Sequence, residues 1–176
     1  MLHYLNTRKD LVMLNLDILL NMATSKMTDG ETTFSGDKTG RQYSVKRHYT
    51  CQDSYVIYYI RCRSCRVGYV GQTKNRLCIR HLGHREEVRQ GQKGMGEHFK
   101  ERHGGGLDLR RDNNIEVAME TFEICVIASV EKGKRDSGKR LDKLEADFQH
   151  RLMCMDAHGG LNIRCEARRG GGKQGN

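Results

Sequence analysis

Two tyrosines, an arginine and a histidine lie close together in the chain and carry groups that can handle a phosphate ester. Tyr58 falls in an apolar, β-branched segment, and Tyr69 follows eleven positions later at the start of a second one. Arg80 and His84 are four residues apart, a spacing that places them on one face of a helix. Cleaving a phosphodiester requires an activated water, neutralisation of the phosphoryl oxygens and help for the leaving alkoxide. Phenol, guanidinium and imidazole groups can supply these functions, so we expect a phosphodiester-cleaving site.

Two polar residues far downstream complete the candidate set. Glu145 lies in the middle of an amphipathic segment among apolar neighbours, a position from which one carboxylate can hold a divalent cation. Asn162 follows a Gly-Gly-Leu sequence and can orient a side chain or the substrate.

Each candidate also has a purely structural interpretation. Tyrosines in strands usually pack with a hydrogen-bonded hydroxyl, and an arginine and a histidine on a helix are usually solvated. A lone glutamate in an amphipathic helix usually lies on the surface, and an asparagine after two glycines is most simply a turn residue. The order and spacing of the whole set are what favour catalysis.

A second group of residues has the types and spacing of a zinc site. Its members are Cys62, Cys65, His98 and His103. Two thiolates and two imidazoles suit tetrahedral Zn²⁺, because each pair can close on the ion from one turn of chain. Residues 66–97 form a much longer insert than in a small zinc finger, so zinc would fasten an insertion to the core. The alternatives are a reduced Cys-x-x-Cys pair with exposed histidines, or coordination by His81 or His84.

Charge and cysteine content limit the class of protein. With 31 Lys and Arg against 22 Asp and Glu, the 176-residue chain carries a formal net charge of +9, which favours a polyanionic partner such as nucleic acid. Seven cysteines, an odd number, fit a reducing compartment better than a closed disulfide framework. The most apolar run, 11–22, is interrupted by Asn and Asp residues, so we expect a soluble, intracellular protein without a membrane span.

Hydrophobic periodicity predicts one small α/β (α+β) domain over 43–165, with a three-stranded, mainly antiparallel sheet flanked by helices. The expected strands are 54–61, 68–72 and 115–130, the first two forming a hairpin, and the expected helices are 75–89, 94–102 and 140–155. A leucine-rich pattern near helical spacing predicts a short helix at 1–24, and the polar, glycine-punctuated composition of 25–42 predicts a linker. The glycine-rich basic tail at 166–176 is predicted to be disordered.

Taken together, the motifs resemble the GIY-YIG nuclease family. Val56-Ile57-Tyr58 stands for the first motif and Tyr69-Val70-Gly71 for the second. The downstream residues that follow the family in order are Gln72-Thr73, Leu77, Arg80, His84, Leu144-Glu145 and Gly160-Leu161-Asn162. Cys51, the Cys-x-x-Cys between the motifs and the segment from Glu97-His98 to His103 are similar to the endonuclease domain of Penelope-like retroelements. The resemblance covers 44–164 and departs at Val56, which replaces the first motif's glycine.

This resemblance implies hydrolysis of DNA with one catalytic metal ion. Tyr58 would be the general base on water with His84, and Arg80 would neutralise the scissile phosphate. Tyr69 would help to position that phosphate, Glu145 would hold Mg²⁺ or Mn²⁺, and Asn162 would support the site.

The resemblance further implies that the domain nicks target DNA for insertion of a retroelement, beside a reverse transcriptase in the parent element. Localisation would be nuclear, otherwise cytoplasmic. The rival hypothesis is a zinc-containing nucleic-acid-binding module that does not cut, which the basic charge and Val56 favour. A purely structural zinc protein leaves the tyrosine, arginine and glutamate set unexplained.

Overall fold

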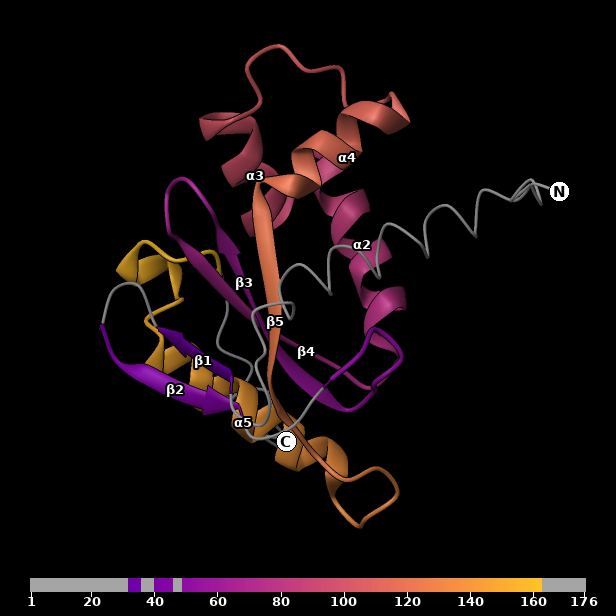
Figure 1. The fold of residues 1–176 in the computed structure, drawn as a ribbon, viewed down its shortest axis with the longest axis vertical. Coiled ribbons are helices and arrows are strands. Elements are labelled where there is room, and N and C mark those ends of the chain that lie inside the picture. Colours follow the sequence, from indigo (N-terminus) through magenta and orange to yellow (C-terminus); the bar gives the residue numbers. More distant parts are fainter. Residues whose placement is uncertain (1–31, 36–39, 46–48, 163–176) are drawn as a thin grey trace, which may run out of the picture.

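A computed structural model describes residues 32–35, 40–45 and 49–162 of the chain, and in it three antiparallel strands form a central sheet with the order β4-β3-β5 (Figure 1). The central strand β3 (Val56–Cys62) pairs with β4 (Gly68–Thr73) and with β5 (Phe122–Ser129). The predicted α+β class, with a small antiparallel sheet flanked by helices, is confirmed. The helix predicted at 1–24 and the tail at 166–176 lie outside the described residues.

Residues of β3 alternate between two separate cores, because successive side chains of a strand point to opposite faces. The even-numbered ones, from Val56 to Cys62, join a core with residues of α2 (Leu77–Gln90), α3 (Lys93–Arg102) and α4 (Asp112–Glu120). Ile57 and Tyr59 belong to a second core, which includes residues of α5 (Ser137–Arg151). A strand covered on both faces reads as an uninterrupted apolar run, as this one does.

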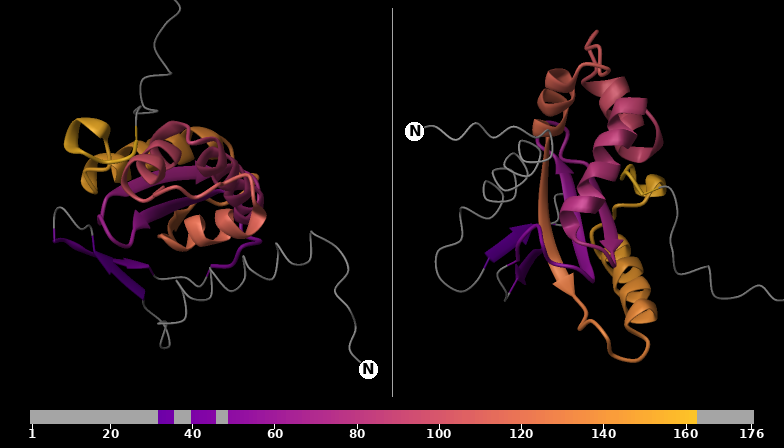
Figure 2. Two further views of the ribbon diagram at one scale, coloured as in Figure 1. Left: turned by 90° about the horizontal axis from the view of Figure 1, so that it is seen from above. Right: turned by 90° about the vertical axis from the view of Figure 1, so that its right-hand side faces the viewer.

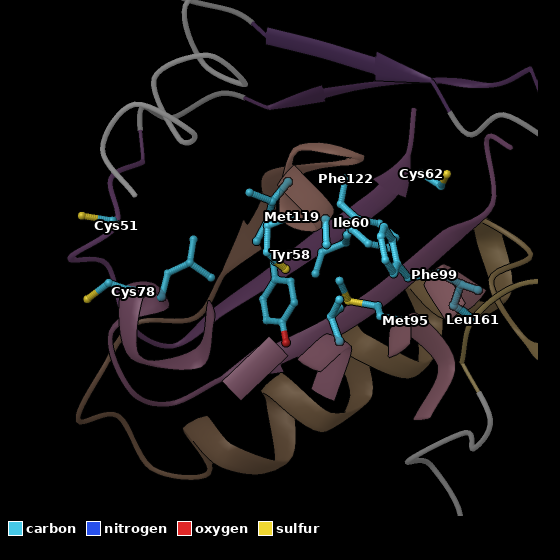
Figure 3. Packing of buried hydrophobic residues seen from close by; sticks show 14 of the residues in the cluster. Cys51, Tyr58, Ile60, Cys62, Cys78, Met95, Phe99, Met119, Phe122 and Leu161 are labelled. Carbon is cyan, nitrogen blue, oxygen red and sulfur yellow. The ribbon is translucent and has the colours of Figure 1, made fainter. Parts of the chain in front are cut away.

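Figures 1 and 2 show α3 and α4 near one end of the sheet and α5 near the other. Figure 3 shows Tyr58, Ile60 and Cys62 following one another along the sheet, with the Tyr58 hydroxyl directed away from the apolar side chains beside it. Tyr58 therefore contributes its ring to the first core and its oxygen to the boundary of that core. Among the described residues, no helix is both long enough and apolar enough to cross a bilayer.

Two segments differ from the sequence-based expectation. The segment 115–120, predicted as part of a strand, belongs to α4, since Ile115, Ala118 and Met119 are buried at helical spacing and the strand begins only at Phe122. The strand β1 (Thr32–Ser35) lies within the predicted linker and pairs antiparallel with β2 (Gln42–Val45), of which only Gln42 belongs to that linker. Both strands contain β-branched or aromatic residues, which favour extended pairing over a linker.

The last helix also ends earlier than predicted. α5 stops at Arg151, and Met153 adopts a left-handed backbone conformation with φ 53° that a continuing helix would not allow. The chain then passes through the 3₁₀ turn η1 (Asp156–His158) and returns to place Asn162 in a parallel bridge with Met155. This return brings Asn162 beside the sheet.

Candidate active site and metal centre

Tyr58 is the centre of a buried hydrogen-bonded cluster between β3, β4 and α2. Its hydroxyl lies 2.8 Å from His84 Nε2 and accepts a hydrogen bond of 2.8 Å from Arg80 Nε. Arg80 Nη2 also donates to the Tyr69 hydroxyl at 3.4 Å. Tyr58 and His84 are fully buried, whereas the Arg80 side chain is 31% exposed. The structure thus brings together four of the predicted site residues and leaves the guanidinium accessible to a ligand.

The two tyrosines approach each other because Gly71 lies between them. Tyr58 is paired with Gly71 across the β3–β4 ladder, and the two tyrosine ring centroids are 6.3 Å apart. A Cβ atom on residue 71 would come within 2.5 Å of the Tyr58 oxygen and 2.6 Å of the Tyr69 ring. Such separations are far shorter than a van der Waals contact, so this position requires the absence of a side chain.

Both phenols are held in their protonated form. Burial raises the pKa of Tyr58 well above its ordinary value, and the nearby Tyr69 adds to the rise, while Arg80 opposes it. Burial also raises the pKa of Tyr69, again against the effect of Arg80. Burial works against the charge of Arg80, yet its phenolic neighbours and Glu87 leave the guanidinium pKa above the ordinary value. The resting cluster is therefore a cation beside two neutral phenols.

Glu87 belongs to this cluster although sequence reasoning did not single it out. Its Oε2 lies 2.9 Å from His84 Nδ1, and its Oε1 lies 3.7 Å from Arg80 Nη1. A carboxylate three residues after a histidine faces the same side of a helix, and this spacing was the signal that could have found it.

Glu145 approaches from α5, on the other side of β4. It is buried, and its Oε2 accepts a 2.9 Å hydrogen bond from Gln72 Nε2, which also donates to Asp142 Oδ1 at 2.7 Å. Neither Gln72 nor Asp142 was predicted as a site residue. The charge of Glu145 contributes to the raised pKa values of Tyr58 and Tyr69, so it acts across the strand.

The group around Glu145 has the chemistry of a hard-cation site. The two carboxylates could supply oxygen ligands, and within the described part of the chain the buried Gln72 Oε1 has no hydrogen-bond partner. Mg²⁺ and Mn²⁺ prefer carboxylate and carbonyl oxygens. The residues present therefore fit such an ion.

Asn162 uses both ends of its amide to hold the backbone of β4. Its Oδ1 accepts from the Val70 amide at 2.8 Å, and its Nδ2 donates to the Val70 carbonyl at 2.7 Å. Val70 lies between Tyr69 and Gly71, so Asn162 fixes the strand that carries them.

The four predicted metal ligands form a compact cluster. The ligand atoms of Cys62, Cys65, His98 and His103 all lie within 4.8 Å of one another. His103 Nε2 is 3.3 Å from each of the two sulfur atoms. A tetrahedral zinc ion with bonds of about 2.0–2.3 Å spaces its ligand atoms roughly 3.3–3.8 Å apart.

The state of His98 also suits a metal ion. Its buried Nε2 has no hydrogen-bond partner among the described residues. Burial and the neighbouring His103 lower the pKa of His98, which keeps the imidazole in the neutral form that binds metals. The cluster could hold a zinc ion, which would connect the end of β3 to α3.

The rival histidine ligands lie elsewhere. His84 contacts Tyr58 and Glu87, and His81 borders a small apolar cavity beside Ile60 and Met95. Burial, His84 and Arg85 lower the pKa of His81 to about 3. His81 is therefore a neutral core histidine.

Comparison with known proteins adds no relative to this picture. No protein-family model matches the chain, no curated protein matches it, and no solved structure matches it.

Proposed function

We propose that this protein is a metal-dependent DNA endonuclease of the GIY-YIG type, similar to the nuclease domain of Penelope-like retroelements. The observation that supports this most strongly is the Tyr58 hydroxyl, which is held between an arginine and a histidine inside a buried cluster. A structural role for Tyr58 would need one hydrogen-bond partner. Two partners of these chemical types match the requirements of phosphodiester hydrolysis.

In the proposed reaction the scissile phosphate binds at the exposed side of Arg80, beside Tyr69. The guanidinium neutralises the phosphoryl oxygens, and the Tyr69 hydroxyl, which Arg80 already orients, fixes their position. Tyr58 accepts a proton from the attacking water while passing its own to His84. A bound Mg²⁺ or Mn²⁺ ion would supply positive charge at the leaving oxygen.

Glu145, with Gln72 and Asp142 beside it, would hold that catalytic ion. The resident ion of the Cys62, Cys65, His98 and His103 cluster would be Zn²⁺ with a structural role. The two metal sites differ in ligand chemistry, oxygen against sulfur and nitrogen, which lets each select its own ion.

In a cell, the proposed enzyme nicks target DNA, and the freed 3′ hydroxyl primes synthesis by a reverse transcriptase of the parent element. This role places it in the nucleus, and otherwise in the cytoplasm before import. The formal charge of +9 favours binding to the DNA backbone.

A nucleic-acid-binding module that no longer cuts is the second candidate. The full burial of Tyr58 favours it, because a water molecule must reach that hydroxyl for hydrolysis. The buried Glu145 favours the enzyme, since a module that only binds an anionic backbone gains nothing from a carboxylate behind the basic cluster.

Nicking of supercoiled plasmid with Mg²⁺ or Mn²⁺ tests the proposal. Wild type should produce open circles, and Glu145→Gln, which keeps the shape and an acceptor oxygen for Gln72, should reduce the rate at least about 100-fold through loss of the metal ligand. Asp147→Asn is the matched control, because Asp147 lies on the same helix but pairs with Arg151 at the surface.

A second pair of variants tests the proposed role of Tyr58 as the general base. Tyr58→Phe should also lose nicking, whereas Tyr59→Phe, which alters the neighbouring tyrosine in the other core, should retain it. DNA affinity measured by fluorescence anisotropy should stay within about twofold in all variants. If wild type binds DNA without nicking it, the binding module is the correct function.

A further inference from the structure

Glu87 is a mostly buried carboxylate of α2 that hydrolysis as described above does not use. Its side chain is only 13% exposed and contacts the one imidazole that touches Tyr58. A carboxylate removed this far from water is stable only where it has strong partners. Its partners include His84 Nδ1 at 2.9 Å and, more weakly, Arg80 Nη1 at 3.7 Å.

The hydrogen bonds around His84 determine which ring nitrogen carries the proton. Arg80 can only donate, so the Tyr58 oxygen is the acceptor in that bond and its own proton is available for His84 Nε2. Of the two neutral forms of the ring, the one with an unprotonated Nε2 accepts this proton. At the other side of the ring, an ionised carboxylate can only accept, so Nδ1 carries the proton and donates it to Glu87.

Several charged or titratable groups of the described residues lie around His84. They include Tyr58 from β3, Tyr69 from β4, and His81 and Glu87 from α2, with Arg80 on the same Tyr58 oxygen. His81 is neutral and Arg80 is positive, so neither stabilises a proton gained by His84. Among these groups, only Glu87 carries a negative charge against the ring.

We propose that Glu87 is a positioning residue that holds His84 with its proton on Nδ1, so that Nε2 can accept the proton of Tyr58. As a catalytic role this rests on the proposed nuclease function. Hydrogen bonds then connect the Glu87 carboxylate through the His84 imidazole to the Tyr58 phenol, at the site where the water would attack.

The proton balance of the step is complete. As the water oxygen forms its bond to phosphorus, one water proton passes to the Tyr58 oxygen and the Tyr58 proton passes to His84 Nε2. The bond from phosphorus to the leaving sugar oxygen breaks, and that oxygen takes a proton from solvent. The imidazolium beside Glu87 later releases its extra proton to solvent, which restores the starting state.

Nitrogen NMR of ¹⁵N-histidine-labelled protein tests the position of the proton without any reaction. The His84 signals, assigned by their loss in His84→Ala or His84→Gln, should show a protonated Nδ1 and an unprotonated Nε2. In Glu87→Ala the proton should redistribute toward Nε2. A wild-type His84 that carries its proton on Nε2 would overturn the proposal.

Nicking kinetics test the catalytic consequence. Glu87→Gln retains an acceptor for Nδ1 without the charge, and Glu87→Ala removes both, so kcat should fall in that order, by roughly 10- to 100-fold for alanine. KM should change little. Glu86→Gln is the matched control, because Glu86 is the preceding residue but is exposed and pairs with Arg89.

A double variant separates action through His84 from action through Arg80. In a His84→Ala background, Glu87→Ala should have no further effect on kcat, and a full additional loss would overturn the role assigned to Glu87. If wild type does not nick at all, the nuclease function fails, and the NMR result decides the proton position by itself.

Discussion

At the scale of single residues, two adjacent tyrosines of β3 have different roles. One lies in the candidate site and the next lies in the second hydrophobic core. Tyr58 and Tyr59 have the same chemistry, but Tyr58 faces Arg80 and His84 whereas Tyr59 lies in the second core with Ile57. Because the side-chain period of a strand is two residues, a shift of one would exchange them. Chemistry at this site therefore depends on the register of β3.

His81 permits a prediction about pH. In the folded protein its pKa is about 3, against 6.5 in the unfolded chain, so below pH 6.5 the unfolded state binds more protons and stability falls as the pH falls. Between pH 7 and pH 5 this residue should remove about 2 kcal/mol from the free energy of unfolding. His81→Leu should abolish that part of the loss, measured by urea denaturation at both pH values.

The loss of stability between pH 7 and pH 5 must be compared between wild type and His81→Leu, because other groups titrate in both proteins. His158→Leu, which removes an exposed histidine instead, should leave the loss unchanged. An equal decrease in wild type and His81→Leu would contradict the low pKa.

At the scale of elements, β4 joins the two halves of the candidate site. Tyr69 and Gly71 face the cluster of Tyr58, whereas Val70 packs in the second core and Gln72 reaches Glu145. Asn162, more than ninety positions away in the sequence, hydrogen-bonds to the backbone of this strand at Val70. Small shifts of β4 would thus alter the phenols and the carboxylate together.

Gly71→Ala tests the required approach of β4 to Tyr58. A methyl group here would meet the hydroxyl of Tyr58 and an edge carbon of the Tyr69 ring, so the rings must shift from their contacts with Arg80. We expect nicking to fall at least about tenfold and the protein to lose about 1–3 kcal/mol of stability, as overpacked sites do. Plasmid nicking and thermal unfolding measure the two effects.

Gly105→Ala is the control for that experiment, since its methyl group would meet nothing nearer than a backbone oxygen at 3.8 Å. It should behave as wild type. If Gly71→Ala keeps full activity, the geometry assigned to the two tyrosines is wrong.

At the scale of the whole molecule, the Cys and His cluster connects the sheet to the helices at one end. Two ligands come from the end of β3 and the turn after it, and two come from α3 and its C-terminal cap. Without a metal ion, two thiols and a buried imidazole nitrogen would lie together with few partners. A bound ion therefore supports the placement of α3, which packs against the helix that carries Arg80 and His84.

Metal analysis should find one zinc ion per chain, and its removal by a strong chelator should lower Tm by roughly 10 °C or more, because zinc binding contributes to folding. His98→Ala should abolish stoichiometric zinc and give the same low Tm without chelator. Cys125→Ser, which changes a free cysteine outside the cluster, should retain zinc. A metal-free wild type of unchanged Tm would contradict the site.

Local patterns in the sequence by themselves determined the fold class, the β3–β4 hairpin and the two candidate ligand pairs, Cys62 with Cys65 and His98 with His103. These features depend on nearby residues, because strand alternation, helical spacing and Cys-x-x-Cys turns act over a few positions. The same logic failed at 115–120, where an apolar run long enough for either element turned out to include a helix.

Only the tertiary structure decided which polar groups meet. It engaged both ends of the Asn162 amide with Val70 and set the Gln72 amide nitrogen between Asp142 and Glu145. Most of these contacts join residues more than seventy positions apart, whose pairing depends on how the helices pack around the sheet. Polar groups that become buried between the helices and the sheet need hydrogen-bond partners. When a distant part of the chain supplies the partner, no local sequence pattern predicts which residue it is.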